Sequence, residues 1–129
     1  MQSRFTEECE KLSAIMHMID QNTMILCDEA LSGTSSYEAA GIAEEVLRVM
    51  SAKGCRGIFV THIHELSMLP DSINCEEYCR SKLNNMTVDI DEGSGRRLYK
   101  ITVGRSLGKS FASDIAEKYG LSFKQLMSG

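Results

Sequence analysis

The sequence has no large cluster of basic residues, no long apolar run and only one proline. Its 129 residues include 14 Lys and Arg against 18 Asp and Glu, for a net charge of −4. This balance argues against direct capture of a nucleic-acid backbone, which needs clustered cations. No apolar stretch is long enough to span a membrane, and the first residues lack the apolar core of a signal peptide. We therefore expect a cytoplasmic protein without a membrane partner.

The cysteines do not form a disulfide pattern. There are five, an odd number, and most lie in apolar periodic segments. This usage favours reduced thiols in the cytosol. Cys75 and Cys79 have the spacing of half a zinc site, but no second pair lies at a suitable distance along the chain, so simple thiols are favoured. The length suits one domain with a real core.

An apolar run, Met24 to Cys27, stops at two acids, Asp28 and Glu29. Such a run is typical of a strand covered on both faces, as in a parallel sheet. Adjacent carboxylates at a strand's end suit nucleotide hydrolysis, because one can hold a Mg²⁺ shell and the other can orient water. This is the shape of a Walker B motif. The alternative is an acid that only caps the next helix.

A second strand follows after one helix. The pattern predicts a helix over 36–53, ended by Gly54, and a buried strand over 57–61 that leads into His62. Strand, helix and strand at this spacing predict a parallel βαβ unit. Asp28, Glu29 and His62 should then share one edge of the sheet.

A helix precedes the first strand. Apolar residues recur every three or four positions from Phe5 to Ile19, which indicates one buried helix face. Ser3 or Thr6 should cap this helix, and it should end near 20–22.

The spacing of apolar residues changes in the second half of the chain. A helical turn over 66–69 should be stopped by Pro70, and 72–80 is ambiguous. Alternating residues predict an antiparallel hairpin, with its loop at 91–95, added at the edge of the parallel sheet. A helix should start at Ser110 and close at Gly120, and Ser122 should cap a last turn.

Two stretches imitate other sites. Gly104 to Ser110 ends in Gly-Lys-Ser but has three residues, rather than four, between its first glycine and Gly-Lys. A tight glycine turn before a helix is therefore favoured over a P-loop. His62 and His64 resemble metal ligands of an amidohydrolase barrel, yet that fold needs more strands and more ligands than this chain has.

Several motifs together resemble one known family. They are Ser3-Arg-Phe-Thr-Glu-Glu8, Met24-Ile-Leu-Cys-Asp-Glu29, Ser32-Gly-Thr-Ser35, Phe59-Val-Thr-His62 with Glu65-Leu66, and the tail from Gly108 to Leu121. In order and spacing they look like the second half of the ATPase domain of MutS-type DNA mismatch-repair proteins. That family is a branch of the ABC ATPase superfamily. The resemblance covers nearly the whole chain.

The resemblance implies a nucleotide site with ATP and Mg²⁺. Asp28 would hold Mg²⁺ through water, and Glu29 would position the attacking water. His62 would be the switch histidine that contacts the γ-phosphate. In the family this chemistry requires Mg²⁺ and turns ATP and water into ADP and phosphate.

The resemblance also implies a homodimer. Ser3, at the signature helix, would reach the γ-phosphate of the nucleotide bound by the partner. The same interface would be lined by the loop after Walker B, formed by Gly33, Thr34 and Ser35. DNA would be bound through domains outside this sequence, and nucleotide state would control that binding.

The family's P-loop and first strands lie upstream of the helix with which this sequence opens. We therefore expect residues 1–129 to be the carboxy-terminal half of the ATPase domain, within a longer protein. The expected fold is a partial P-loop NTPase of the α/β class, with parallel strands, flanking helices and an antiparallel hairpin at the edge. The chain alone is predicted to be inactive as an ATPase.

Two departures concern the substrate. The family's acid-glycine pair after the Thr-Ser segment is replaced by Glu38-Ala-Ala-Gly41, and Ala112 replaces a glycine of many mismatch-repair members. Ala112 leans toward paralogues outside classical mismatch repair, and both departures bear on the DNA substrate more than on the ATPase chemistry. Two other functions stay open: a non-catalytic dimerisation module, and a small metal hydrolase built on His62, His64 and Asp28.

Overall fold

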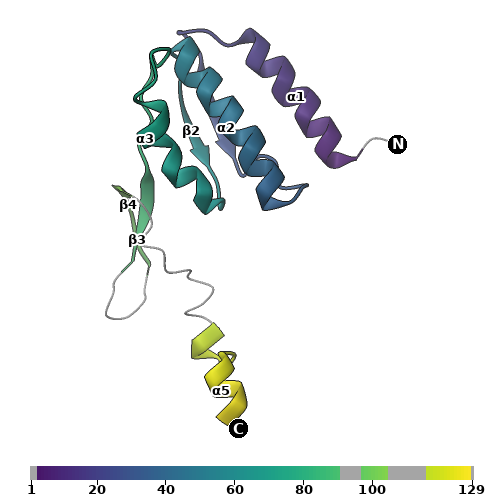
Figure 1. Ribbon diagram of the computed structural model, residues 1–129, viewed down its shortest axis with the longest axis vertical. Coiled ribbons are helices and arrows are strands. Elements are labelled where there is room, and N and C mark those ends of the chain that lie inside the picture. Colours follow the sequence, from purple (N-terminus) through teal and green to yellow (C-terminus); the bar gives the residue numbers. More distant parts are fainter. Residues whose placement is uncertain (1–2, 91–96, 105–115, 129) are drawn as a thin grey trace. The chain divides into compact units, whose positions relative to one another are not determined.

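The computed structural model of the chain describes residues 3–90, 97–104 and 116–128. The chain divides into two units, Met1–Asn84 and Asn85–Gly129. The first unit carries three helices and a parallel strand pair (Figure 1). In chain order its elements are α1 (Arg4–Met18), β1 (Met24–Asp28), α2 (Ser36–Lys53), β2 (Arg56–Val60), the 3-10 helix η1 (His64–Met68) and α3 (Leu69–Ile73).

Helix α1 begins as predicted and ends earlier. Ser3 is the cap, and its Oγ accepts a hydrogen bond from the Thr6 N–H at 3.1 Å. The helix ends at Met18 because the chain turns at Asp20, whose Oδ1 accepts from the Asn22 N–H at 2.8 Å. The expected continuation to 20–22 is therefore a turn.

Helix α2 has the predicted bounds. Ser35 caps its start, and Gly54 ends it with φ 72°, a left-handed conformation that favours glycine. The buried side of the helix consists of Ala39, Ala43, Val46, Met50 and Ser51. This side packs on the strands and carries much of the core.

Strands β1 and β2 pair in parallel, from Met24 opposite Arg56 to Asp28 opposite Val60. The predicted βαβ unit is confirmed. Ile25, Cys27 and Phe59 lie on one face of this sheet and join the clusters formed with the helices.

The other face of the sheet is open. Its apolar side chains are Met24 (67% exposed), Leu26 (71%), Ile58 (57%) and Val60 (46%). The expectation of strands covered on both faces is wrong for this structure, because α1, α2 and α3 all pack on the same side.

Pro70 does not stop a helix. It lies in the first turn of α3, where its missing N–H has no helical partner to lose. Leu69, Pro70 and Ile73 are buried, so this short helix closes one end of the core.

The ambiguous segment after α3 is an ordered connection. Asn74 fixes its two ends together. Its Nδ2 donates to the Leu83 carbonyl at 2.8 Å, and its Oδ1 accepts from the Leu83 N–H at 2.7 Å. Arg48 of α2 donates from Nε to the Tyr78 hydroxyl at 3.0 Å, a bond that raises the pKa of Arg48. These contacts hold residues 74–84 against the rest of the first unit.

The second unit contains an antiparallel strand pair, β3 (Met86–Ile90) and β4 (Arg97–Val103). Val88 lies opposite Ile101, and the register shifts between Val88 and Ile90. The hairpin is confirmed, and its loop at 91–95 lies outside the described residues. Among the described strands β3 and β4 pair only with each other, so the expected single sheet is instead two separate sheets.

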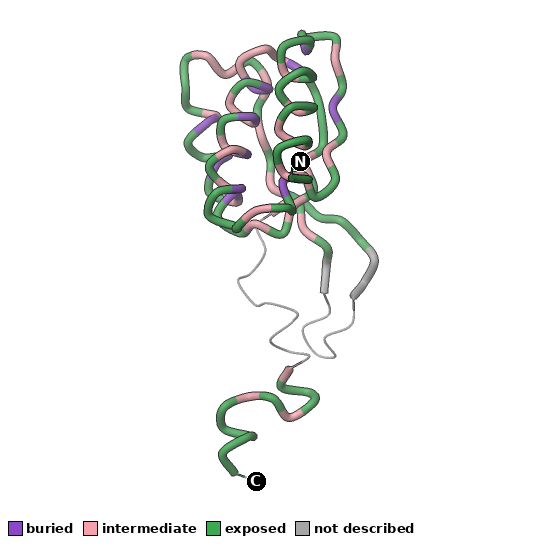
Figure 2. Tube along the Cα trace, turned by 90° about the vertical axis from the view of Figure 1, so that its right-hand side faces the viewer, coloured by how far each residue is buried: buried purple, intermediate pink, exposed green. Residues whose placement is uncertain are grey.

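The end of the chain is helical and exposed. Gly120 has φ 77° and closes a helical segment that includes 116–118, and Leu121 N–H donates to the Ala116 carbonyl at 2.8 Å. Ser122 caps α5 (Phe123–Ser128), in which no residue is buried (Figure 2). The predicted start of the earlier helix at Ser110, like Lys109 and Ala112, lies outside the described residues. Within the described parts of the chain no helix has the length and apolar character to cross a membrane.

Candidate functional site

The carboxyl edge of the parallel sheet carries the predicted acids. Asp28 is the last residue of β1 and lies opposite Val60 of β2. The ladder continues one residue further, because the Glu29 N–H donates to the Val60 carbonyl at 2.8 Å. This bond brings Glu29 beside the residues that leave β2. Both acids are exposed at this edge.

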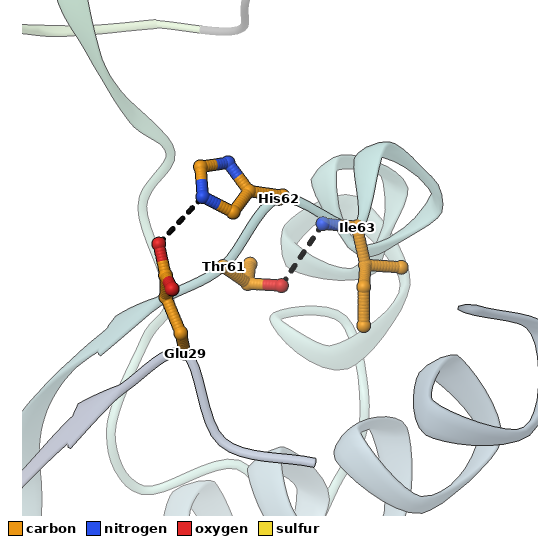
Figure 3. Close-up of polar contacts among 4 residues, drawn as sticks. All are labelled: Glu29, Thr61, His62 and Ile63. Atoms are coloured by element: carbon orange, nitrogen blue, oxygen red, sulfur yellow. Dashed lines mark hydrogen bonds and ion pairs between the residues drawn. The ribbon is translucent and has the colours of Figure 1, made fainter. Parts of the chain in front are cut away.

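Glu29 and His62 are in direct contact. Nε2 of His62 lies 2.5 Å from Oε1 of Glu29, and the ring points toward the carboxylate (Figure 3). An ionised carboxylate only accepts hydrogen bonds, so Nε2 carries the proton and donates. The side chains are 86% and 52% exposed for His62 and Glu29, so a ligand can reach both. The predicted meeting of these two residues is confirmed.

A local turn sets the direction of His62. The Ile63 N–H donates to Thr61 Oγ1 at 3.0 Å, spanning the histidine (Figure 3). Threonine hydroxyls form such turns when the chain leaves a strand. The imidazole is thereby turned toward the end of β1.

The loop after β1 leads from Glu29 into α2. Ser35 caps α2 by accepting from the Glu38 N–H at 3.3 Å, and Thr34 donates from Oγ1 to the Glu38 carboxylate. Gly33 lies against α1, since a Cβ atom at this position would lie 3.3 Å from Phe5 Cβ. The predicted loop residues therefore connect the sheet edge to α1.

Ser3 lies at the start of α1, two residues before the Phe5 contact. Its hydroxyl is exposed, and besides the Thr6 N–H it contacts Thr6 Oγ1 at 2.9 Å. The structure thus joins the first turn of α1 to the loop through Phe5 and Gly33, rather than through Ser3 itself.

Sequence reasoning missed one contact at this site. The Leu31 N–H donates to Oε1 of Glu8, across 23 residues of sequence. Leu31 is buried, with 1% exposed, and has φ 68°, while Glu29 has φ 52°. No local pattern marks these features, because they arise only when α1 packs on the loop.

Two thiols of the first unit are held neutral. Burial raises the pKa of Cys27, which lies on the covered face of β1, and burial is also the main cause that raises the pKa of Cys55. All five cysteines are free. A raised pKa lowers the thiolate fraction, so neither Cys27 nor Cys55 is suited to act as a nucleophile.

The acids of the site suit a hydrated cation. Among the described residues, no three His, Cys, Asp or Glu side chains gather closely enough to enclose a metal. Asp28 offers one exposed carboxylate at the sheet edge. This donor fits Mg²⁺, which keeps several waters and commonly takes one or two carboxylates.

The chain matches known proteins over almost its whole length. The family model described as MutS domain V matches residues 1–127. The chain is 36% identical over 124 residues to the DNA mismatch repair protein MutS of Rickettsia typhi, covering 93% of this chain and 13% of that protein. It is 31% identical over 123 residues to the protein of the same name from Halothermothrix orenii, again covering 93% and 13%.

A relative of another name also matches. The Endonuclease MutS2 of Lactiplantibacillus plantarum is 30% identical over 123 residues, covering 92% of this chain and 14% of that protein. The chain thus spans 13–14% of the length of these relatives. With a family model that matches 127 of its 129 residues, the chain belongs to the MutS family, as a MutS domain V.

Proposed function

We propose that this chain supplies the Walker B, switch-histidine and signature-helix part of a MutS-type ATPase. The observation that carries the proposal is the contact between Glu29 and His62 at the carboxyl edge of β1 and β2. Open α/β sheets place their ligands at this edge. The reaction is the hydrolysis of ATP to ADP and phosphate.

Glu29 orients the attacking water and accepts one of its protons. The water oxygen attacks the γ-phosphorus, and the bond from that phosphorus to the β–γ bridging oxygen breaks. The leaving oxygen stays on ADP, and the proton taken by Glu29 returns to solvent. Glu29 suits this role because its exposed carboxylate stands just beyond the strand end on a backbone fixed by Val60.

His62 contacts the γ-phosphate. Its Nε2–H, which donates to Glu29 in this structure, is the same donor that a phosphate oxygen would accept. Transfer of this hydrogen bond from carboxylate to phosphate would release Glu29 to bind water. The pair is therefore a switch between an idle state and a nucleotide-bound state.

Asp28, with its exposed carboxylate at the end of β1, would hold Mg²⁺ through water. When bound, this ion neutralises charge on the phosphate oxygens. Asp28 lies on the open face of the sheet with Leu26 and Val60, opposite the face that the helices cover.

The site is completed in a homodimer. Ser3 and the loop of Gly33, Thr34 and Ser35 contact the nucleotide of the partner, so that hydrolysis depends on assembly. The exposed hydroxyl of Ser3 at a helix start supports this role, because helix N-termini favour phosphate. Nucleotide state then controls DNA binding by other domains of the longer protein.

A second candidate function is a dimerisation module without catalysis. The open apolar face of β1 and β2 favours it, because a face of this kind is usually covered by a partner surface. In that case the Glu29–His62 contact would be structural only, and its loss would leave assembly unchanged.

A chimaera tests the proposal. This chain replaces the matched segment of the Rickettsia typhi relative, and ATP turnover is compared with that of the unaltered relative. We expect turnover in the chimaera, and expect Asp28→Asn to remove most of it while Asp20→Asn, outside the site, leaves it unchanged. A well-folded chimaera that binds its partners but never hydrolyses ATP would favour the dimerisation module.

A further inference from the structure

Two residues of the loop that follows β1 have unusual backbone conformations. Glu29 has φ 52° and Leu31 has φ 68°, both in the left-handed region. Residues other than glycine rarely adopt this region, because their Cβ atom crowds the backbone. Such conformations persist only where the surrounding structure holds them, and they occur often at functional sites.

Both ends of the loop are tied to other elements. The Glu29 N–H donates to the Val60 carbonyl of β2 at 2.8 Å. The Leu31 side chain is buried in the core cluster with Ala39 and Leu66, and the Leu31 N–H donates to the Glu8 carboxylate of α1. Glu8 is therefore the side chain that holds the far end of the strained segment.

Helix α1 packs on the rim of the core through half-buried side chains. None of its residues is fully buried, and it lies beside α2 at the edge of the helical layer (Figure 1). Besides the Glu8 bond, Lys53 of α2 donates from Nζ to the Met16 carbonyl at 2.9 Å. The helix is thus tied to the loop through Glu8 in its first half and to α2 through the Met16 carbonyl near its end.

We propose that Glu8 is a positioning residue for Glu29. By accepting from the Leu31 N–H, it keeps Glu29 and Leu31 in the left-handed conformations that direct the Glu29 carboxylate to His62. The role rests on the proposed ATPase function only where turnover is concerned. It also means that a displacement of α1 is transmitted directly to the carboxylate that orients water.

The first test is independent of ATP. In the isotope-labelled chain, NMR should detect a coupling across the hydrogen bond from the Leu31 amide nitrogen to the Glu8 carboxylate carbon. In Glu8→Ala, the side-chain nitrogen signals of His62 should shift in the same direction as in Glu29→Gln. Absence of the coupling, or unmoved His62 signals in a folded Glu8→Ala chain, would overturn the proposal.

Matched variants separate positioning from general stability. Lys53→Met removes a polar tie of α1 that lies away from the loop, so it should weaken the packing of α1 while leaving the His62 signals in place. Glu8→Gln keeps an oxygen acceptor and should restore most of the wild-type signals. If Lys53→Met moves the His62 signals as far as Glu8→Ala does, Glu8 is merely structural.

Turnover gives the second readout, in the chimaera defined above. Glu8→Ala should lower kcat by roughly 10–100-fold with little change in KM, because a displaced catalytic group costs rate rather than binding. Glu8→Gln should recover most of the rate. Full kcat in Glu8→Ala would overturn the positioning role. If instead Glu29→Gln has no effect on kcat while the NMR shifts occur, the ATPase proposal fails and the positioning stands.

Discussion

His62 and Glu29 lie 33 residues apart in sequence, and their side chains meet with Nε2 2.5 Å from Oε1. The contact joins the ends of two parallel strands. Both side chains are largely exposed, so the pair contributes less than about 1 kcal/mol to folding. Under the proposed function, the pair acts in chemistry rather than in folding.

Replacement of His62 tests whether the pair matters for turnover rather than for folding. In the chimaera, His62→Ala should reduce kcat by roughly 10²–10³-fold, the usual loss when one donor to a developing charge is removed. Its thermal midpoint should barely change. His64→Ala, two residues further along in η1, is the matched control and should keep its turnover. Equal losses in both variants would instead support a metal site that uses both histidines.

Gly57 is required by the pairing of the two strands. A Cβ atom at this position would lie 2.4 Å from the Ile25 carbonyl oxygen and 3.0 Å from Met50 Cε. Gly57→Ala should therefore destabilise the chain by about 1–3 kcal/mol, as overpacking does. Gly41→Ala is the control, because nothing lies within 4 Å of a Cβ atom placed at this position, and the residue is inside α2. It should stabilise by about 0.5–1 kcal/mol, and denaturant unfolding of both variants checks the pair.

The open face of the parallel sheet should make the chain self-associate. Leu26 and Ile58 lie side by side there, and exposed apolar surface of this kind seeks a partner. Leu26→Lys with Ile58→Lys should shift the chain toward monomer in light scattering. Met18→Lys, at an exposed apolar residue of α1, should not. A wild-type chain that is monomeric at every concentration contradicts this prediction.

The chain by itself should bind ATP weakly and not hydrolyse it. Phosphate affinity in this class rests on a loop of N–H groups and a lysine that grip the phosphates. The sequence offers only Gly104 to Ser110 as an imitation of that loop. Calorimetry with Mg-ATP checks the affinity. Micromolar binding, or turnover that Lys109→Ala abolishes, would show that this stretch is a true P-loop.

Local signals explain which parts of the fold could be predicted. Ser35 and Gly54 bound α2 through capping chemistry that acts within a few residues, so sequence alone located the helix over 36–53 and its end at Gly54. The meeting of Glu29 and His62 followed from the parallel βαβ unit, which has one handedness and one edge for both strand ends.

The misses depend on contacts between distant segments. The exposure of Leu26 and Ile58 reflects which face the helices cover, and an apolar run cannot report that. Pro70 lies in the first turn of α3 rather than ending a turn, because Leu69 and Ile73 are buried in the core. The bond from Leu31 to Glu8 spans 23 residues and has no local signature.

The role of Glu29 decides between a catalytic and a structural reading of the site. In the chimaera, Glu29→Gln should slow hydrolysis by roughly 10²–10⁴-fold, the range for a lost general base. Nucleotide affinity should stay near the wild-type value, because the water-orienting carboxylate does not grip the phosphates. The measurement is single-turnover hydrolysis beside equilibrium binding of Mg-ATP on the same preparation. Slow hydrolysis with intact binding is the predicted result. A loss of affinity as large as the loss of rate, or unchanged hydrolysis, would contradict it.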